Sequence, residues 1–188
     1  MASGIQIVNH DPIVERFLET IAEKVGGDLL AYRNHIYRVL TYASHFLGPD
    51  ARGYEHIAFA LVFHDVGMWT DNNLAYLEPS QSIAEEVRAR DMAHLDAALV
   101  RNIIHWHHKM TRYSGPDEKI VEAARKADWI DASLGIISNG VSKSEIRRVN
   151  SDVPVLGFPN VLMRLASDLH GGNRAGGLMR VLGRVYKL

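Results

Sequence analysis

The chain has 188 residues, 47% hydrophobic and 23% charged, which suits one globular domain with a hydrophobic core. Lys and Arg total 21, Asp and Glu total 22, and a net charge of −1 argues against a surface for binding a nucleic-acid polymer. Because cysteine is absent, disulfides, zinc–thiolate sites and a cysteine nucleophile are excluded, and any bound metal must use His, Asp or Glu.

The first predicted helix follows Asp11-Pro12, since aspartate is a favoured N-cap residue and proline fits the first helical position. It should run to about residue 25, where two glycines stop it. We expect Asp28 to cap a second helix that reaches about Leu47. One stripe of this helix, at spacings of three and four, carries Tyr32, His35, Ile36, Val39, Ala43 and Phe46. On such a stripe His35 alone fits either a hydrogen-bonded core residue or a metal ligand.

A third helix is predicted over about 51–66. Its run 57–63 is apolar on every side, so it should be central and buried. It ends in His64-Asp65-Val66-Gly67, with Gly67 placed as a C-terminal stop. An aspartate there faces the negative end of the helix dipole, and a bound dication would offset that penalty. The alternative is that Asp65 caps a neighbouring helix and His64 is a hydrogen-bonded core histidine.

Residues 68–78 suggest a loop, and further helices are expected over about 79–90, 95–110 and 117–134. A short capped helix should begin near Ser142, and two last helices are expected over about 160–169 and 174–187. Asp128 lies on an alanine-rich helix face, where room remains for an ion or a water, and Asp131 follows one turn later. No segment alternates like a strand, so residues 1–188 should form a single all-α domain.

The order His35, His64-Asp65, Asp128 on three helices resembles the HD superfamily of metal-dependent phosphohydrolases. Four sequence motifs carry the resemblance. They are His35-Ile-Tyr-Arg38-Val39, Leu61-Val-Phe-His64-Asp65-Val66-Gly67, Ile104-His-Trp-His107-His108 and Lys126-Ala-Asp128-Trp-Ile-Asp131. The resemblance covers about 28–135, and helices within 142–188 should pack on that HD-like core. It implies an HD-type multi-helix bundle in which His35, His64, Asp65 and Asp128 bind one divalent metal.

The resemblance also implies hydrolysis of a phosphate mono- or diester, nucleotide-like, by a metal-activated water. Mn, Fe, Co, Ni, Mg and Zn all remain candidates for the ion. In this scheme Asp65 and His107 have catalytic roles, and Arg38, His108 and Lys109 bind the substrate. Family branches with two metals tend to carry a histidine where this chain has Ser82, so a second metal is not favoured.

Other members of the superfamily keep further functions open. Many catalytic members have lysine where this chain has Met68, and Asp71 is a candidate general acid of the deoxynucleotide monophosphatase type. A cyanamide-hydratase-like enzyme, an iron oxygenase and a metal- or nucleotide-binding sensor without turnover are the alternatives. The expected partner is a small phosphate ester or nucleotide, with no membrane and with a homodimer left open. The N-terminus lacks the build of a signal peptide and no apolar run could span a bilayer, so we expect a soluble cytoplasmic protein.

Overall fold

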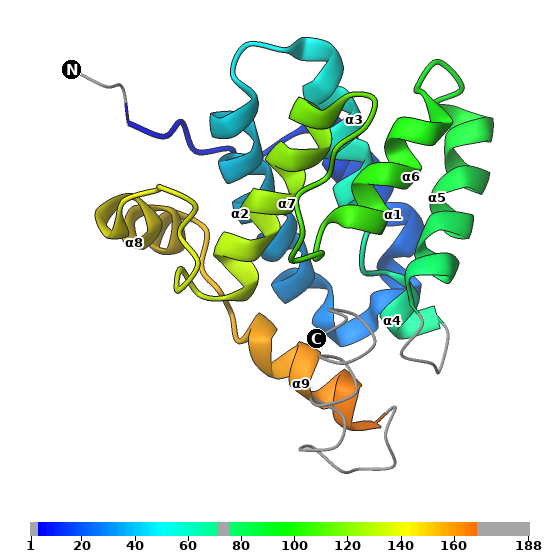
Figure 1. Cartoon of the computed structure of the whole chain (residues 1–188). Helices are drawn as coiled ribbons and strands as arrows, with labels where there is room; N and C mark the ends of the chain where they lie inside the picture. Colours follow the sequence, from blue (N-terminus) through cyan, green and yellow to red (C-terminus); the bar gives the residue numbers. More distant parts are fainter. Residues whose placement is uncertain (1–3, 71–75, 169–188) are drawn as a thin grey trace.

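The computed structural model describes residues 4–70 and 76–168, and every regular element within them is a helix (Figure 1). In chain order these are α1 (Pro12–Val25), a 3-10 turn η1 (Gly26–Asp28), α2 (Leu29–Leu47), α3 (Ala51–Phe63), α4 (Gly67–Thr70), α5 (Leu77–Asp91), α6 (Ala97–Trp106), α7 (Glu118–Ala132), α8 (Lys143–Asp152) and α9 (Phe158–Asp168). The prediction of an all-α single-domain bundle is confirmed. The expected helix over 174–187 lies outside the described residues.

The ends of the first two helices show one predicted cap and one correction. The Asp11 carboxylate accepts hydrogen bonds from the backbone N–H groups of Ile13 and Val14, as an N-cap should. Gly26 ends α1 with a φ of 60°, a backbone conformation that favours glycine. Asp28 caps no helix with its side chain. Its Oδ2 instead accepts from Trp69 Nε1 at 2.9 Å and from Arg164 Nη2 at 2.5 Å, because the chain folds two later helices against this position.

The centre of the bundle is the long pairing of α2 with α7, which lie side by side in Figure 1. Helix α3 contacts α1, α2, α6 and α7, and its residues 57–63 are fully buried, as their apolar sequence predicts. Helix α5 packs on α6, while α8 and α9 both contact α2. The side chains of α2, α3 and α7 that face one another therefore share one interior.

The segment after His64-Asp65 departs from the prediction. Residues 67–70 form the short helix α4, and α5 begins at Leu77, two residues before Pro79. Gly67 has no left-handed conformation, so it is no C-terminal stop of the expected kind. A Cβ built on it would lie 2.1 Å from the Tyr76 carbonyl oxygen. Gly67 is therefore explained by a close backbone approach, which brings the start of α5 beside the end of α3.

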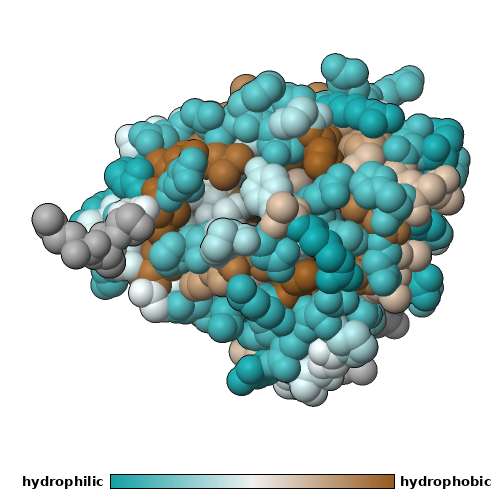
Figure 2. All heavy atoms as spheres, turned by 90° about the horizontal axis from the view of Figure 1, so that it is seen from above, coloured by the Kyte–Doolittle hydropathy of each residue, from teal (hydrophilic) through white to brown (hydrophobic). Residues whose placement is uncertain are grey.

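Hydrophilic side chains predominate on the face in Figure 2, with hydrophobic patches showing between them. This distribution is ordinary for a domain that keeps most of its large apolar side chains inside. None of the helices within the described ranges combines the length and apolar character needed to cross a bilayer.

Candidate metal centre

Three helices bring the predicted ligands to one point. His35 comes from the middle of α2, and His64 and Asp65 follow directly after α3. One ligand atom from each of the three lies within 4.8 Å of the other two, and all three side chains are buried. The Nε2 atoms of His35 and His64 are 3.0 Å apart, and Asp65 Oδ2 lies 3.2 Å from His64 Nε2. A group of this kind could hold a metal ion.

Asp128, from α7, is the fourth predicted ligand and lies beside the group of three. Its Oδ1 is 3.5 Å from His35 Nε2 and 3.8 Å from His64 Nε2, and its side chain is buried. The sequence therefore identified four side chains that the fold does bring together. The set of two imidazoles and two carboxylates suits several divalent ions and selects none of them.

The outer hydrogen bonds of the two histidines fix which ring nitrogen faces inward. His35 Nδ1 lies 2.7 Å from Asp131 Oδ2, and His64 Nδ1 lies 2.6 Å from the Leu61 carbonyl oxygen. Carboxylate and carbonyl oxygens only accept hydrogen bonds, so each Nδ1 carries a proton and donates. In the neutral rings both Nε2 atoms are then lone-pair acceptors. Two such lone pairs facing each other at 3.0 Å repel unless a proton or a cation lies with them.

His107 extends this acceptor cluster. It follows the last residue of α6, and its Nδ1 lies 2.6 Å from the Ile104 carbonyl oxygen, so this Nδ1 also donates. Its Nε2 is 3.3 Å from Asp65 Oδ1. The two Asp65 oxygens thus point to different histidines, Oδ2 to His64 and Oδ1 to His107. The predicted role of His107 beside Asp65 is compatible with this placement.

His108 lies behind His107 rather than on the carboxylates. Its Nδ1 is 3.0 Å from His107 Nε2 and 3.1 Å from the Tyr76 hydroxyl oxygen. Burial and the neighbouring His107 lower the pKa of His108 to about 2. A neutral ring at neutral pH can bind a substrate through a hydrogen bond, whereas it cannot supply the positive charge that would neutralise a phosphate.

Arg38 is buried and already hydrogen-bonded within the fold, and its predicted role in substrate binding stays a prediction. Its side chain is buried, its Nε and Nη2 donate to the Asp131 carboxylate at 2.5 and 2.8 Å, and its Nη1 donates to the Pro154 carbonyl at 2.9 Å. Asp131 also contacts His35, so Arg38 holds the carboxylate that orients a candidate ligand. Asp131 follows Asp128 by one helical turn, but nothing in the sequence joins it to Arg38.

The last two predicted site residues are Lys109 and Asp71. The Lys109 backbone carbonyl accepts from Arg125 Nη1 and Trp129 Nε1, which fixes the chain after His108. Its role in substrate binding stays a prediction. Asp71, the candidate general acid, lies outside the described residues.

Charge and burial act in opposite directions on the central groups. Burial favours the neutral form of His64, but the carboxylates of Asp65 and Asp128 outweigh it and raise the pKa of His64 to about 9. Burial likewise opposes ionisation of Asp65, but His64 and His107 hold its pKa well below the ordinary value. For Asp128 burial prevails over the neighbouring histidines, and its pKa is raised. Without a metal, a proton on His64 thus balances Asp65.

We expect metal and proton to compete for His64, with opposite effects of pH. In the metal-free protein a folded-state pKa of about 9, above the ordinary 6.5, contributes stability that is complete below about pH 6.5 and is lost as pH rises through 9. Metal binding must displace that proton, so metal affinity should rise over the same window. Melting curves between pH 6 and 9.5, with and without metal, measure both trends.

The matched control for this experiment is His64→Gln, which keeps a polar side chain but cannot titrate. The metal-free variant should lose the pH-dependent part of its melting temperature between pH 6.5 and 9. If metal-free wild type and variant changed identically with pH, His64 would not be the group that carries the proton.

Three aromatic residues of the site were missed by sequence reasoning. The Tyr32 hydroxyl lies 3.3 Å from His64 Nδ1 and accepts from the Asp65 backbone N–H at 3.3 Å. Its position three residues before His35 was a usable signal, since both share one helix face. Tyr76 falls in a segment expected to be a loop. Phe158 stacks on His35 with ring centroids 4.3 Å apart, and nothing in the sequence connects these two residues.

Comparisons of the chain with protein-family models, with curated proteins and with solved structures find no match. The case for a function therefore rests on the residues of this chain and on their geometry.

Proposed function

We propose that this protein is a metal-dependent phosphohydrolase of the HD type, acting on a phosphate mono- or diester of nucleotide-like character. The observation that carries the proposal is the buried cluster in which the Nε2 atoms of His35 and His64 face each other and the Nε2 of His107 faces Asp65. Such a cluster is costly to bury unless a proton or a metal ion compensates it. Phosphate-ester hydrolysis is inferred from the four sequence motifs, whose order and residues resemble those of the HD superfamily.

In this proposal His35, His64, Asp65 and Asp128 hold the ion. A divalent ion supplies Lewis acidity, which lowers the pKa of a bound water by several units and polarises a phosphoryl oxygen. The protein residues do the rest. Asp131, itself held by Arg38, fixes the His35 tautomer and ring orientation. His107, whose Nε2 lies 3.3 Å from Asp65 Oδ1 while His64 approaches Oδ2, is placed to move a proton beside that carboxylate.

A direct test measures hydrolysis of a panel of nucleoside mono-, di- and triphosphates, cyclic nucleotides and p-nitrophenyl esters with Mn, Co, Ni, Mg, Fe or Zn. We expect activity that requires one of these ions and disappears with a chelator. His107→Gln should lower kcat by about 100-fold, the range of a lost general acid or base, while metal content stays near wild type. Chelator-insensitive hydrolysis, or a panel without any turnover by metal-loaded protein, would count against the proposal.

One observation favours a second candidate, hydration of a small neutral nitrile such as cyanamide. Tyr76, which contacts both His107 and His108, belongs with Met68 and Leu165 to a small apolar cluster. Met68 stands where many phosphohydrolases of this superfamily have lysine, so this position offers no cation to a phosphate. Adding cyanamide to the panel, with urea as the measured product, separates the two functions.

A further inference from the structure

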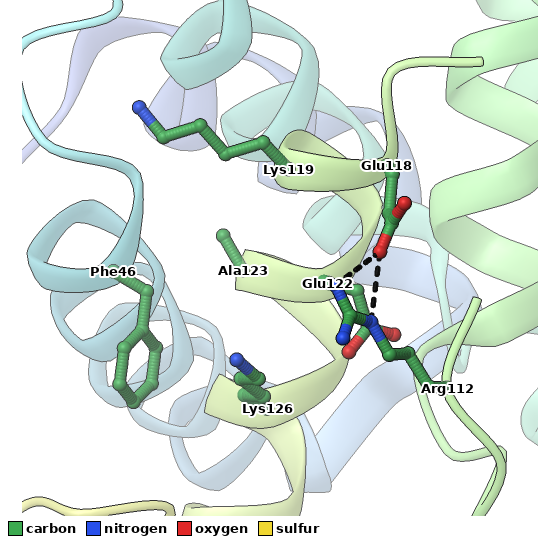
Figure 3. A pocket seen from close by; sticks show the side chains of 7 residues that line it. All are labelled: Phe46, Arg112, Glu118, Lys119, Glu122, Ala123 and Lys126. Carbon is green, nitrogen blue, oxygen red and sulfur yellow. Dashed lines mark hydrogen bonds and ion pairs between the residues drawn. The ribbon is translucent and has the colours of Figure 1, made fainter. Parts of the chain in front are cut away.

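A hollow of about 470 Å³ lies between Phe46 in the last turn of α2 and the side chains of Lys119, Ala123 and Lys126 on α7 (Figure 3). Lys119, on its wall, precedes Asp128 by nine residues, which is about 14 Å along a helix. The volume falls within the range of roughly 300–1,000 Å³ that is typical of small-molecule sites. None of the residues that line the hollow is a predicted metal ligand, so the two sites are distinct although Lys126 lies two residues before Asp128.

The carboxylates around this hollow are already paired. Glu118 accepts from Arg112 Nε at 2.8 Å, and Glu122 accepts from Arg125 Nε and from the Tyr113 backbone N–H at 2.5 and 2.8 Å. In Figure 3 Arg112 and the two glutamates gather on one side of α7. They are thus poor partners for a cation on the other side.

Two lysines on that other side have no such partner. Lys119 and Lys126 make no ion pair with any residue that the structure describes, and both line the hollow. With Ala123 they form one stripe of α7 at spacings of four and three. Ala123 leaves the space between the two long side chains open (Figure 3). The chain as a whole has a net charge of −1, so this pair of cations is a local feature.

Phe46, in the last turn of α2, forms the facing wall. Its ring is only partly buried and packs against the edge of the core. The Lys126 ammonium lies 5.9 Å from the centroid of this ring, near the outer limit of a cation–π contact. An aromatic face beside two ammonium groups offers one surface for a planar ring and another for an anion.

We propose that this hollow is a binding site for an aromatic anion, a planar ring joined to a phosphate or carboxylate, that is independent of the metal centre. The anion binds Lys119 and Lys126, and the ring packs on Phe46. A mononucleotide has this chemistry and serves as the probe. Binding at this site needs no metal, so this proposal can be tested independently of the phosphohydrolase proposal.

The test is a calorimetric titration of adenosine 5′-monophosphate into the full chain in EDTA, with inorganic phosphate and adenosine as separate titrants. We expect saturable binding of the monophosphate that weakens as salt is added, and much weaker binding of either half alone. Lys119→Glu and Lys126→Glu should each weaken binding about tenfold or more, because each removes a charge-assisted contact. Asp65→Ala should leave binding unchanged, since the metal centre is not involved.

Lys143→Glu is the matched control, because Lys143 is an exposed lysine on α8, away from the hollow. Phe46→Leu keeps an apolar side chain against the core, so the variant should fold. It should bind the monophosphate more weakly than wild type does, and its affinity for inorganic phosphate should be unchanged. Three outcomes would overturn the proposal. The first is that the monophosphate shows no saturable binding in EDTA. The second is that Lys143→Glu weakens binding as much as Lys119→Glu and Lys126→Glu do, and the third is that Asp65→Ala abolishes binding while these two lysine variants keep it.

Discussion

Replacing Asp65 with alanine is expected to abolish metal binding and every metal-dependent property of the protein. Asp65 is the one side chain of the cluster whose two oxygens approach two different histidines, at 3.2 Å from His64 and 3.3 Å from His107. Loss of a residue that only orients a ligand typically costs 10–100-fold in metal affinity, so loss of a ligand itself should cost at least about 100-fold.

The size of this effect can be read from stability as well as from activity. At a metal concentration of about 100 times Kd, binding to the folded state alone adds about 2.7 kcal/mol. For a chain of this length each kcal/mol raises Tm by about 2–4 °C, so wild type should gain roughly 5–10 °C. Asp65→Ala should gain almost nothing at the same concentration. Metal content by elemental analysis and Tm with and without metal measure the two consequences independently of any substrate.

Asp96→Ala provides a control that lowers stability without touching the site. The Asp96 carboxylate caps α6 by accepting from the Leu99 backbone N–H at 3.0 Å, and losing such a cap costs about 1 kcal/mol. This variant should melt earlier than wild type but keep its full gain with metal. A metal-dependent gain that survived in Asp65→Ala would show that the ion binds elsewhere.

The sequence predicted well that the site residues point inward. It predicted less well which residues they contact. Helical spacing places His35 on the face of Tyr32 and Val39, and that face does lie in the interior. The apolar run 57–63 likewise requires α3 to be central, so the residues that follow it emerge in the core. Periodicity reports which face is buried, whereas the grouping of the four residues into one ligand set came from the resemblance to the HD superfamily.

Periodicity does not report which neighbours meet across helices. Arg38 and Asp131 are far apart in the sequence, and their contact depends on how α2 packs against α7 and on where the 153–154 carbonyls lie. Asp28 suits an N-cap by residue type, but a tryptophan and an arginine from later helices take its carboxylate. Gly67 suits a helix stop, but a carbonyl packs where its side chain would be. Each of these departures was decided by tertiary packing, which local sequence does not encode.

The largest expected loss of stability follows substitution of Asp131 by asparagine. The change preserves shape but leaves the Arg38 guanidinium buried without its counter-ion, and breaking a buried pair in this way costs about 3–5 kcal/mol. A drop in Tm of roughly 6–20 °C is expected for a chain of this length. Chemical denaturation of the metal-free protein measures the difference directly.

The loss should also depend on pH, with a definite sign. Burial alone would raise the pKa of Asp131, but hydrogen bonds from His35 and Arg38 outweigh it and lower the pKa below its ordinary value of 3.8. The stability that Asp131 contributes is therefore present above about pH 4 and is lost as pH falls through the lower folded-state value. Wild type and Asp131→Asn should differ most near neutral pH and converge in acid. A difference that persisted undiminished at low pH would mean that the charge of Asp131 is not its source.

A double substitution separates the two tasks that Asp131 performs. Replacing Arg38 and Asp131 together, as Arg38→Met with Asp131→Leu, removes both buried charges and should destabilise much less than the sum of the single changes. The same protein lacks the carboxylate that orients His35, so its metal affinity should still fall by about 10–100-fold. Recovered stability with weakened metal binding is the expected pattern, because the ion pair supports the fold whereas the contact with His35 supports the site. If the double variant bound metal as tightly as wild type, Asp131 would be a structural residue only, and the inward orientation of His35 would need another cause, such as its stacking on Phe158.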